Sequence, residues 1–139
     1  MDLKTAKIIA NRCHLGQTRR DGITPFITHV ERVVKRCERY GVEAEIVATL
    51  HEILEDSPIT LNDLERKGFS NNILEAVSCL TKDNHQSYSA YINGIKNNNL
   101  ARLVKIQDIL DNISDTPSTK QIRKYSEALL VLVDADTKM

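Results

Sequence analysis

The sequence predicts a single all-α domain, a bundle of about seven or eight helices. Apolar residues recur every three or four positions in one segment after another, as in helices that bury one face. We find no alternation of apolar and polar residues of the kind that is typical of a half-buried strand. A chain of 139 residues can bury a real core but is short for two domains, so we expect residues 1–139 to form one unit.

The expected helices follow one another along the whole chain. Each is bounded by residues that commonly start or end helices, with Thr28, Thr60 and Ser70 as expected N-caps and Gly41 and Gly68 as expected end points. A loop rich in glycine and proline separates the first two segments, and Ser-Pro ends the third. The expected segments are residues 3–13, 29–40, 43–55, 61–67, 73–80, 88–95, 100–113 and 119–133.

Composition limits the kinds of partner that the protein can have. Nineteen basic and nineteen acidic side chains cancel, so no overall field favours nucleic acid or an anionic membrane, and an anionic ligand needs a local cluster. Cys13, Cys37 and Cys79 are an odd number at wide spacing, which indicates reduced thiols and a cytoplasmic location. Neither a signal peptide nor a membrane span is expected.

The segment Val47 to Ser57, VATLHEILEDS, carries four ionisable groups within an apolar run. In a helix these groups, which are His51, Glu52, Glu55 and Asp56, would share an arc of roughly 140°. Burying several unpaired charges costs several kcal/mol, and a bound metal cation is the simplest compensation. The alternative is an ordinary solvated helix face.

Two more polar residues extend this candidate site. His29 is expected in the first turn of its helix, and Asp108 lies in a strongly apolar segment where an unpaired acid would be costly. Two imidazoles and two carboxylates suit a divalent transition metal with open positions for water or substrate. A capping role for His29 and a surface position for Asp108 is the alternative.

Three motifs around these positions resemble a known family. The string HLGQTRRDGITPFITH, residues 14–29, is similar to H-x-G-Q-x-R-K-x-G-x-P-Y-I-x-H; LHEILEDS, residues 50–57, to L-H-D-x-x-E-D-T; and LVKIQDILDN, residues 103–112, to L-V-K-L-A-D-x-x-x-N. This order resembles the HD superfamily of metal-dependent phosphohydrolases, and in particular small stand-alone hydrolases of the RelA/SpoT type. The resemblance implies removal of the 3′-pyrophosphate from the alarmone (p)ppGpp, a small-molecule nucleotide.

The resemblance also implies a role for each matching residue. The metal, Mn²⁺ by preference, would be held by His29, His51, Glu52 and Asp108. Water would be oriented or deprotonated by the acidic pair Glu55 and Asp56. The nucleotide would be bound by Arg19, Arg20, Lys105 and Asn112.

The chain departs from the family pattern at three positions. Glu52 replaces the aspartate of the HD pair, and its extra methylene moves the carboxylate by about 1.5 Å. Phe26 replaces a tyrosine, and Asp111 stands where the family often has histidine. Two alternatives therefore stay open: hydrolysis of another nucleotide phosphate, or a catalytically weakened relative that binds a nucleotide.

Overall fold

The structure is a computed structural model that describes residues 2–137. Within this range the chain forms nine α-helices and a short 3₁₀ helix, with no strand beyond an isolated bridge between Thr18 and Pro25, and so confirms the all-α prediction. None of these helices is both long and apolar enough to cross a membrane. The elements are α1 (Leu3–Cys13), α2 (Phe26–Cys37), η1 (Glu38–Tyr40), α3 (Val42–Leu50), α4 (Ile53–Asp56), α5 (Leu61–Arg66), α6 (Asn71–Cys79), α7 (Tyr88–Ile95), α8 (Asn99–Ile113) and α9 (Thr119–Thr137).

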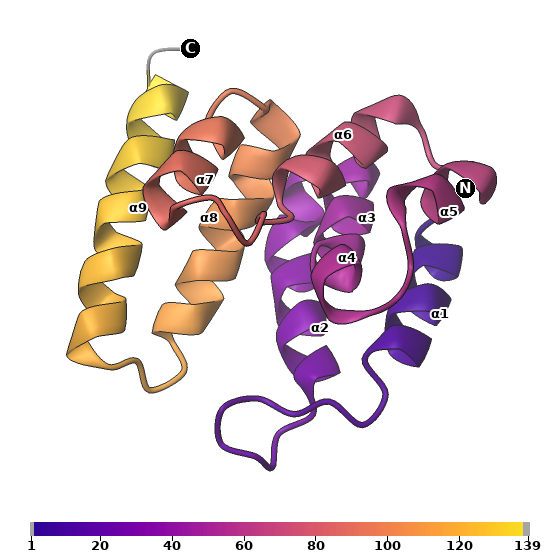
Figure 1. Ribbon diagram of the computed structural model, residues 1–139, viewed down its shortest axis with the longest axis horizontal. Coiled ribbons are helices and arrows are strands. Elements are labelled where there is room, and N and C mark those ends of the chain that lie inside the picture. Colours follow the sequence, from indigo (N-terminus) through magenta and orange to yellow (C-terminus); the bar gives the residue numbers. More distant parts are fainter. Residues whose placement is uncertain (1, 138–139) are drawn as a thin grey trace.

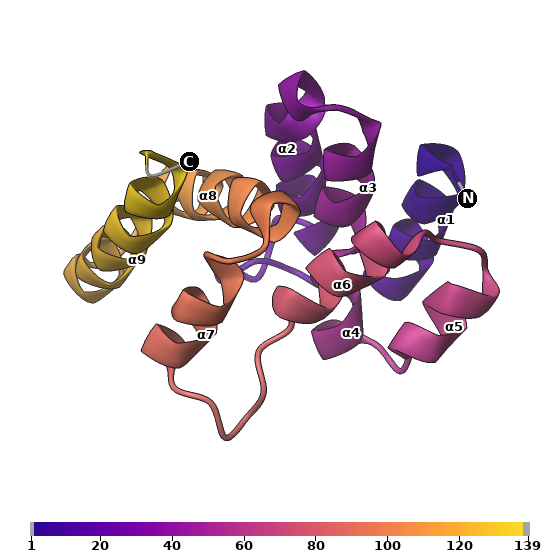
Figure 2. The same ribbon diagram turned by 90° about the horizontal axis from the view of Figure 1, so that it is seen from above.

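Helices α2, α3 and α8 form the centre of the molecule. Helix α3 packs between α1 and α2, while α8 packs on α2, α3 and α6. Helices α7 and α9 cover the other side of α8, so α7 to α9 lie at one end and α1 to α6 at the other (Figures 1 and 2). Fully buried side chains from these helices, among them Val33, Leu50 and Ile109, fill the core where they meet.

Helix α2 begins earlier than the sequence predicts. Its N-cap is Pro25, and the expected cap, Thr28, lies inside the helix. The amide of Phe26 donates a hydrogen bond of 2.9 Å to the carbonyl of Gln17 in the preceding loop. The loop thereby satisfies one of the free amides at the helix start, and a capping side chain is not required there.

The helix predicted over residues 43–55 is divided in two. Helix α3 ends at Leu50, and His51 and Glu52 form a turn before α4 begins. The His51 imidazole lies 2.5 Å from the carbonyl oxygen of Ala48, one of the last carbonyls of α3, which lack an amide partner within the helix. The break therefore places the two residues of the predicted HD pair at a helix junction.

Other predicted boundaries are confirmed. Thr60 caps α5 in a capping box with Asp63, and Ser70 caps α6. Gly41 and Gly68 have φ angles of 102° and 90°, in the left-handed region that glycine adopts without strain.

Candidate metal centre

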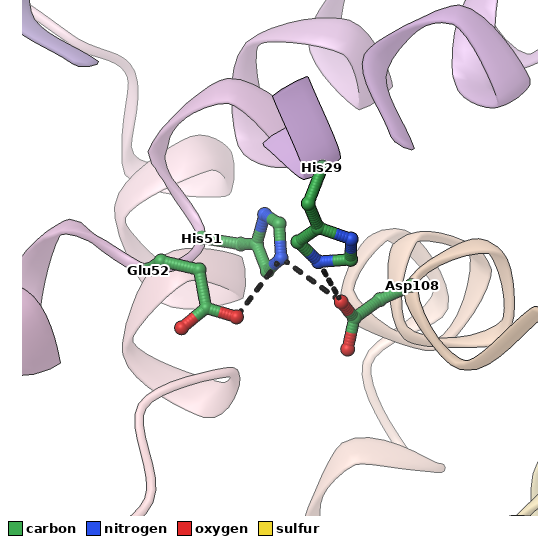
Figure 3. A group of neighbouring side chains, drawn as sticks. All are labelled: His29, His51, Glu52 and Asp108. Atoms are coloured by element: carbon green, nitrogen blue, oxygen red, sulfur yellow. Dashed lines mark hydrogen bonds and ion pairs between the residues drawn. The ribbon is translucent and has the colours of Figure 1, made fainter. Parts of the chain in front are cut away.

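Four side chains from three parts of the chain converge on one point (Figure 3). His29 comes from α2, His51 and Glu52 from the turn between α3 and α4, and Asp108 from α8. One nitrogen or oxygen atom of each lies within 4.8 Å of the others. The Glu52 side chain is 22% exposed while the other three are buried, so the cluster reaches solvent on the Glu52 side.

The atoms that face one another are two ring nitrogens and two carboxylates. Asp108 Oδ1 lies 2.8 Å from His29 Nε2 and 3.3 Å from His51 Nε2. Glu52 Oε1 lies 3.3 Å from the same His51 nitrogen. A mixed set of nitrogen and oxygen donors at this separation fits a divalent transition metal.

The outward nitrogen of each imidazole meets an acceptor. His51 Nδ1 faces the Ala48 carbonyl, and His29 Nδ1 lies 2.6 Å from Asp111 Oδ2. A neutral imidazole that donates from Nδ1 presents the lone pair of Nε2, the form that binds a metal. The donor set and the orientation of both rings thus fit a cation held by the four side chains.

In the absence of a cation, the carboxylates of the cluster raise the pKa of both imidazoles and so favour their protonated forms. Burial acts to lower the pKa of His51, but hydrogen bonds and charge from Asp108 and Glu52 outweigh it and raise this pKa to about 10. The pKa of His29 is also raised, against its burial, by Asp108 and Asp111. Burial acts to raise the pKa of Asp108, yet Lys105 and the two imidazoles hold it well below its usual range.

Binding of a cation should therefore depend on pH. The cation needs neutral imidazoles, whereas the pKa of about 10 favours a protonated His51 at neutral pH and the pKa of His29 is raised in the same direction, so binding is expected to release protons. Between about pH 6 and 8 we expect the apparent Mn²⁺ affinity to rise as pH rises, by about tenfold per pH unit for each proton released. Calorimetric titration in buffers of different ionisation enthalpy counts these protons. An affinity that stays constant over this range would contradict the expectation.

The predicted acidic pair lies at the edge of the cluster. Burial, followed by the charge of Glu52, raises the pKa of Asp56. Burial also raises the pKa of Glu55, although its carboxylate accepts a hydrogen bond of 2.5 Å from the Lys82 amide. Glu55 lines an open groove of about 470 Å³ together with Leu54, Thr81, Lys82, Asp83 and Asn84.

The four residues predicted to bind substrate occupy two places. Arg19 donates hydrogen bonds to Asn112 Oδ1 at 3.0 Å and to Asp115 Oδ2 at 3.0 and 3.2 Å, which joins the loop before α2 to the end of α8. Arg20 is exposed beside them and donates to the Asp115 carbonyl. Lys105 lies apart from this group, with its Nζ 2.9 Å from Asp108 Oδ2.

Two further residues, Asp111 and Gln17, support the site, and no sequence pattern assigns them a positioning role. Asp111, which contacts His29, could have been suspected because it lies one helical turn after Asp108 in the same apolar helix. Gln17 Nε2 donates a hydrogen bond to the Asp56 carbonyl at 3.2 Å, and Gln17 Oε1 accepts one from His14 Nδ1 at 2.9 Å. Neither motif spacing nor helical periodicity indicates these contacts. His14 is buried at the end of α1.

Comparisons with known proteins agree with the fold and the motifs. No family model matches the chain. The chain is 34% identical over 82 residues to the bifunctional (p)ppGpp synthase/hydrolase SpoT of Escherichia coli K12, and likewise to a guanosine-3′,5′-bis(diphosphate) 3′-pyrophosphohydrolase of E. coli O157:H7. Each match covers 58% of this chain and 11% of the relative, so the match spans about a tenth of the length of these curated relatives.

A solved structure has the same fold over almost the whole chain. It belongs to a metazoan ortholog of SpoT, described as hydrolysing ppGpp and acting in starvation responses. The two share a TM-score of 0.78 at 23% identity, over 96% of this chain and 84% of the other. The chain therefore has the helical fold of this structure, and more than half of its sequence is similar to a part of SpoT.

Proposed function

We propose that the chain is a metal-dependent phosphohydrolase of the cytoplasm that removes the 3′-pyrophosphate of (p)ppGpp, with Mn²⁺ as its ion. The convergence of His29, His51, Glu52 and Asp108 within 4.8 Å is the observation that carries the proposal. The homology to SpoT over 82 residues supports the choice of substrate.

The four clustered side chains would hold the cation. A divalent cation bound there supplies Lewis acidity, which lowers the pKa of water and stabilises charge on a phosphoryl group. Lys105 neutralises the second oxygen of Asp108 and keeps this carboxylate ionised. The Ala48 carbonyl and Asp111 orient the two imidazoles from behind.

Glu55 and Asp56 are proposed to orient or deprotonate the attacking water. Their pKa values are raised, mainly by burial, and a higher pKa makes a carboxylate a better base. The charge of Glu52 contributes to the raised pKa of both residues, which supports a role for them beside the candidate metal ligands. Proton transfer can therefore occur at the side of the cluster that opens to solvent.

Arg19, Arg20 and Asn112 are proposed to bind the nucleotide. A substrate with two diphosphate groups carries several negative charges, and guanidinium groups match phosphate oxygens in geometry as well as charge. Arg19 and Asn112 already contact each other, so the loop before α2 and the end of α8 form one surface for the ligand. Lys105 adds a positive charge beside Asp108.

The test is a product assay on the purified chain. With ppGpp and Mn²⁺ we expect GDP and pyrophosphate, separated by anion exchange, and no products after the metal is removed with EDTA. Parallel reactions with GTP, GDP and other nucleotides, and with Mg²⁺ or Zn²⁺, define the substrate and the ion. Release from another nucleotide but not from ppGpp would favour a different substrate, while binding of ppGpp without turnover would identify a weakened relative.

A further inference from the structure

Asp111 is a buried acid that contacts the cluster from outside. Its side chain is 1% exposed, and its Oδ2 lies 2.6 Å from His29 Nδ1. The other nitrogen of the same ring lies 2.8 Å from Asp108, one turn earlier on α8. His29 is thus held at both ring nitrogens by two acids of one helix, which fixes the orientation of the ring.

Arg32 holds Asp111 from the opposite side. Arg32 lies one turn after His29 on α2, and its Nε and Nη2 lie 2.8 and 3.2 Å from the two oxygens of Asp111. Such a two-point contact fixes a carboxylate more firmly than a single bond does. Arg36 is more distant, with its Nε at 3.9 Å. The Arg32 side chain is 42% exposed, so the contact links the buried acid to the surface.

Each of the two buried acids on α8 therefore pairs with a different basic side chain. Lys105 neutralises Asp108, and Arg32 neutralises Asp111. Burying a carboxylate without a partner costs several kcal/mol, so Asp111 can stay charged beside His29 because Arg32 is present. A charged acceptor binds an imidazole N–H more strongly than a neutral one.

We propose that Asp111 is a positioning residue of the metal centre and that Arg32 keeps it in place. The inference rests on the proposed function only in taking His29 as a metal ligand. The hydrogen bond to Asp111 keeps the proton at Nδ1, leaves Nε2 free for the cation and makes the ring a stronger donor. Asp111 acts through His29 and does not touch the substrate in this role.

Substitution of Asp111 and Arg32 tests the proposal by metal affinity. For Asp111→Ala we expect Mn²⁺ to bind roughly 10- to 100-fold more weakly. Arg32→Ala should weaken binding by a smaller factor, and Arg32→Lys should recover part of it, because lysine restores the charge but not the two-point contact. Calorimetry on the folded proteins, checked by circular dichroism, gives the affinities. Arg39→Ala is the matched control, since Arg39 lies over the Tyr40 ring, away from the cluster.

Nitrogen NMR of His29 separates positioning from a general effect on stability. In the Zn²⁺-loaded protein we expect one tautomer, with the proton at Nδ1 and the metal at Nε2. This signature should be lost in Asp111→Ala and kept in Arg39→Ala. In a hydrolysis assay, Asp111→Ala should lower kcat more than it changes KM, because the arginines proposed to bind substrate are intact.

Three results would overturn the inference. The first is wild-type affinity and an unchanged His29 spectrum in both Asp111→Ala and Arg32→Ala. The second is a wild-type protein that binds no divalent cation. The third applies if Asp111→Ala does not fold: it is an Mn²⁺ affinity of Arg32→Ala equal to that of the wild type. Arg32→Ala is expected to fold because the Arg32 side chain is partly exposed. A wild-type protein that binds Mn²⁺ but leaves ppGpp intact would reject the proposed function alone.

Discussion

Replacement of Asp108 by asparagine is expected to remove Mn²⁺ binding and hydrolysis together. Asp108 Oδ1 is the one atom that faces both imidazoles, and Oδ2 pairs with Lys105. Asparagine keeps the shape but removes the charge that all three partners share. Losing one partner of a buried ion pair costs about 3–5 kcal/mol. A loss of this size in the free energy of metal binding corresponds to an affinity that is lower by roughly a hundred- to several-thousand-fold.

Two measurements check this prediction. Titration with Mn²⁺ gives the affinity, and the ppGpp assay gives the rate under saturating metal. Asp63→Asn is the matched control: Asp63 is a partly exposed capping residue of α5 and lies outside the cluster, so its substitution should change stability slightly and leave metal binding unchanged. Tight Mn²⁺ binding by Asp108→Asn would show that this carboxylate is not a ligand.

Glu52→Asp is expected to lower metal affinity by on the order of tenfold or more. Glu52 reaches the cluster from the turn after α3, with Oε1 3.3 Å from His51 Nε2. Aspartate would withdraw the carboxylate by about 1.5 Å, while a metal site tolerates changes of only about 0.2 Å. The glutamate is expected to act as a ligand because its length suits the position of its backbone.

A second variant separates reach from charge. Glu52→Gln keeps the length and removes the charge, so a loss in both variants indicates that the site needs both. Glu43→Asp, an exposed change in the first turn of α3, is the matched control and should leave Mn²⁺ affinity unchanged. Higher metal occupancy or new activity in Glu52→Asp would instead support the weakened-relative interpretation.

The fold and the convergence of the cluster could be predicted because their signals are local. Helical periodicity, helix caps and glycines identify most elements. His29 and Asp108 stand out because polar groups in apolar segments require partners. The order of the three motifs then predicts that His29 and Asp108, which are 79 positions apart in the chain, belong to one site.

Other features depend on contacts that no local pattern encodes. The start of α2 follows from a backbone bond between Gln17 and Phe26 across a loop. The break at His51 follows from a side chain that bonds to the end of its own helix. The pairing of His29 with Asp111 requires the register in which α2 packs against α8, and periodicity shows only that both residues lie on helices.

The cluster lies between the two ends of the molecule, and its residues come from both. Asp108 belongs to the end formed by α7 to α9, whereas His29, His51 and Glu52 belong to the other (Figure 1). Separating α8 from α2 and α3 would scatter the ligands, so a bound ion opposes that movement. Its stabilising effect grows with the logarithm of its free concentration. We therefore expect the resistance of the chain to proteolysis to increase with the amount of metal bound.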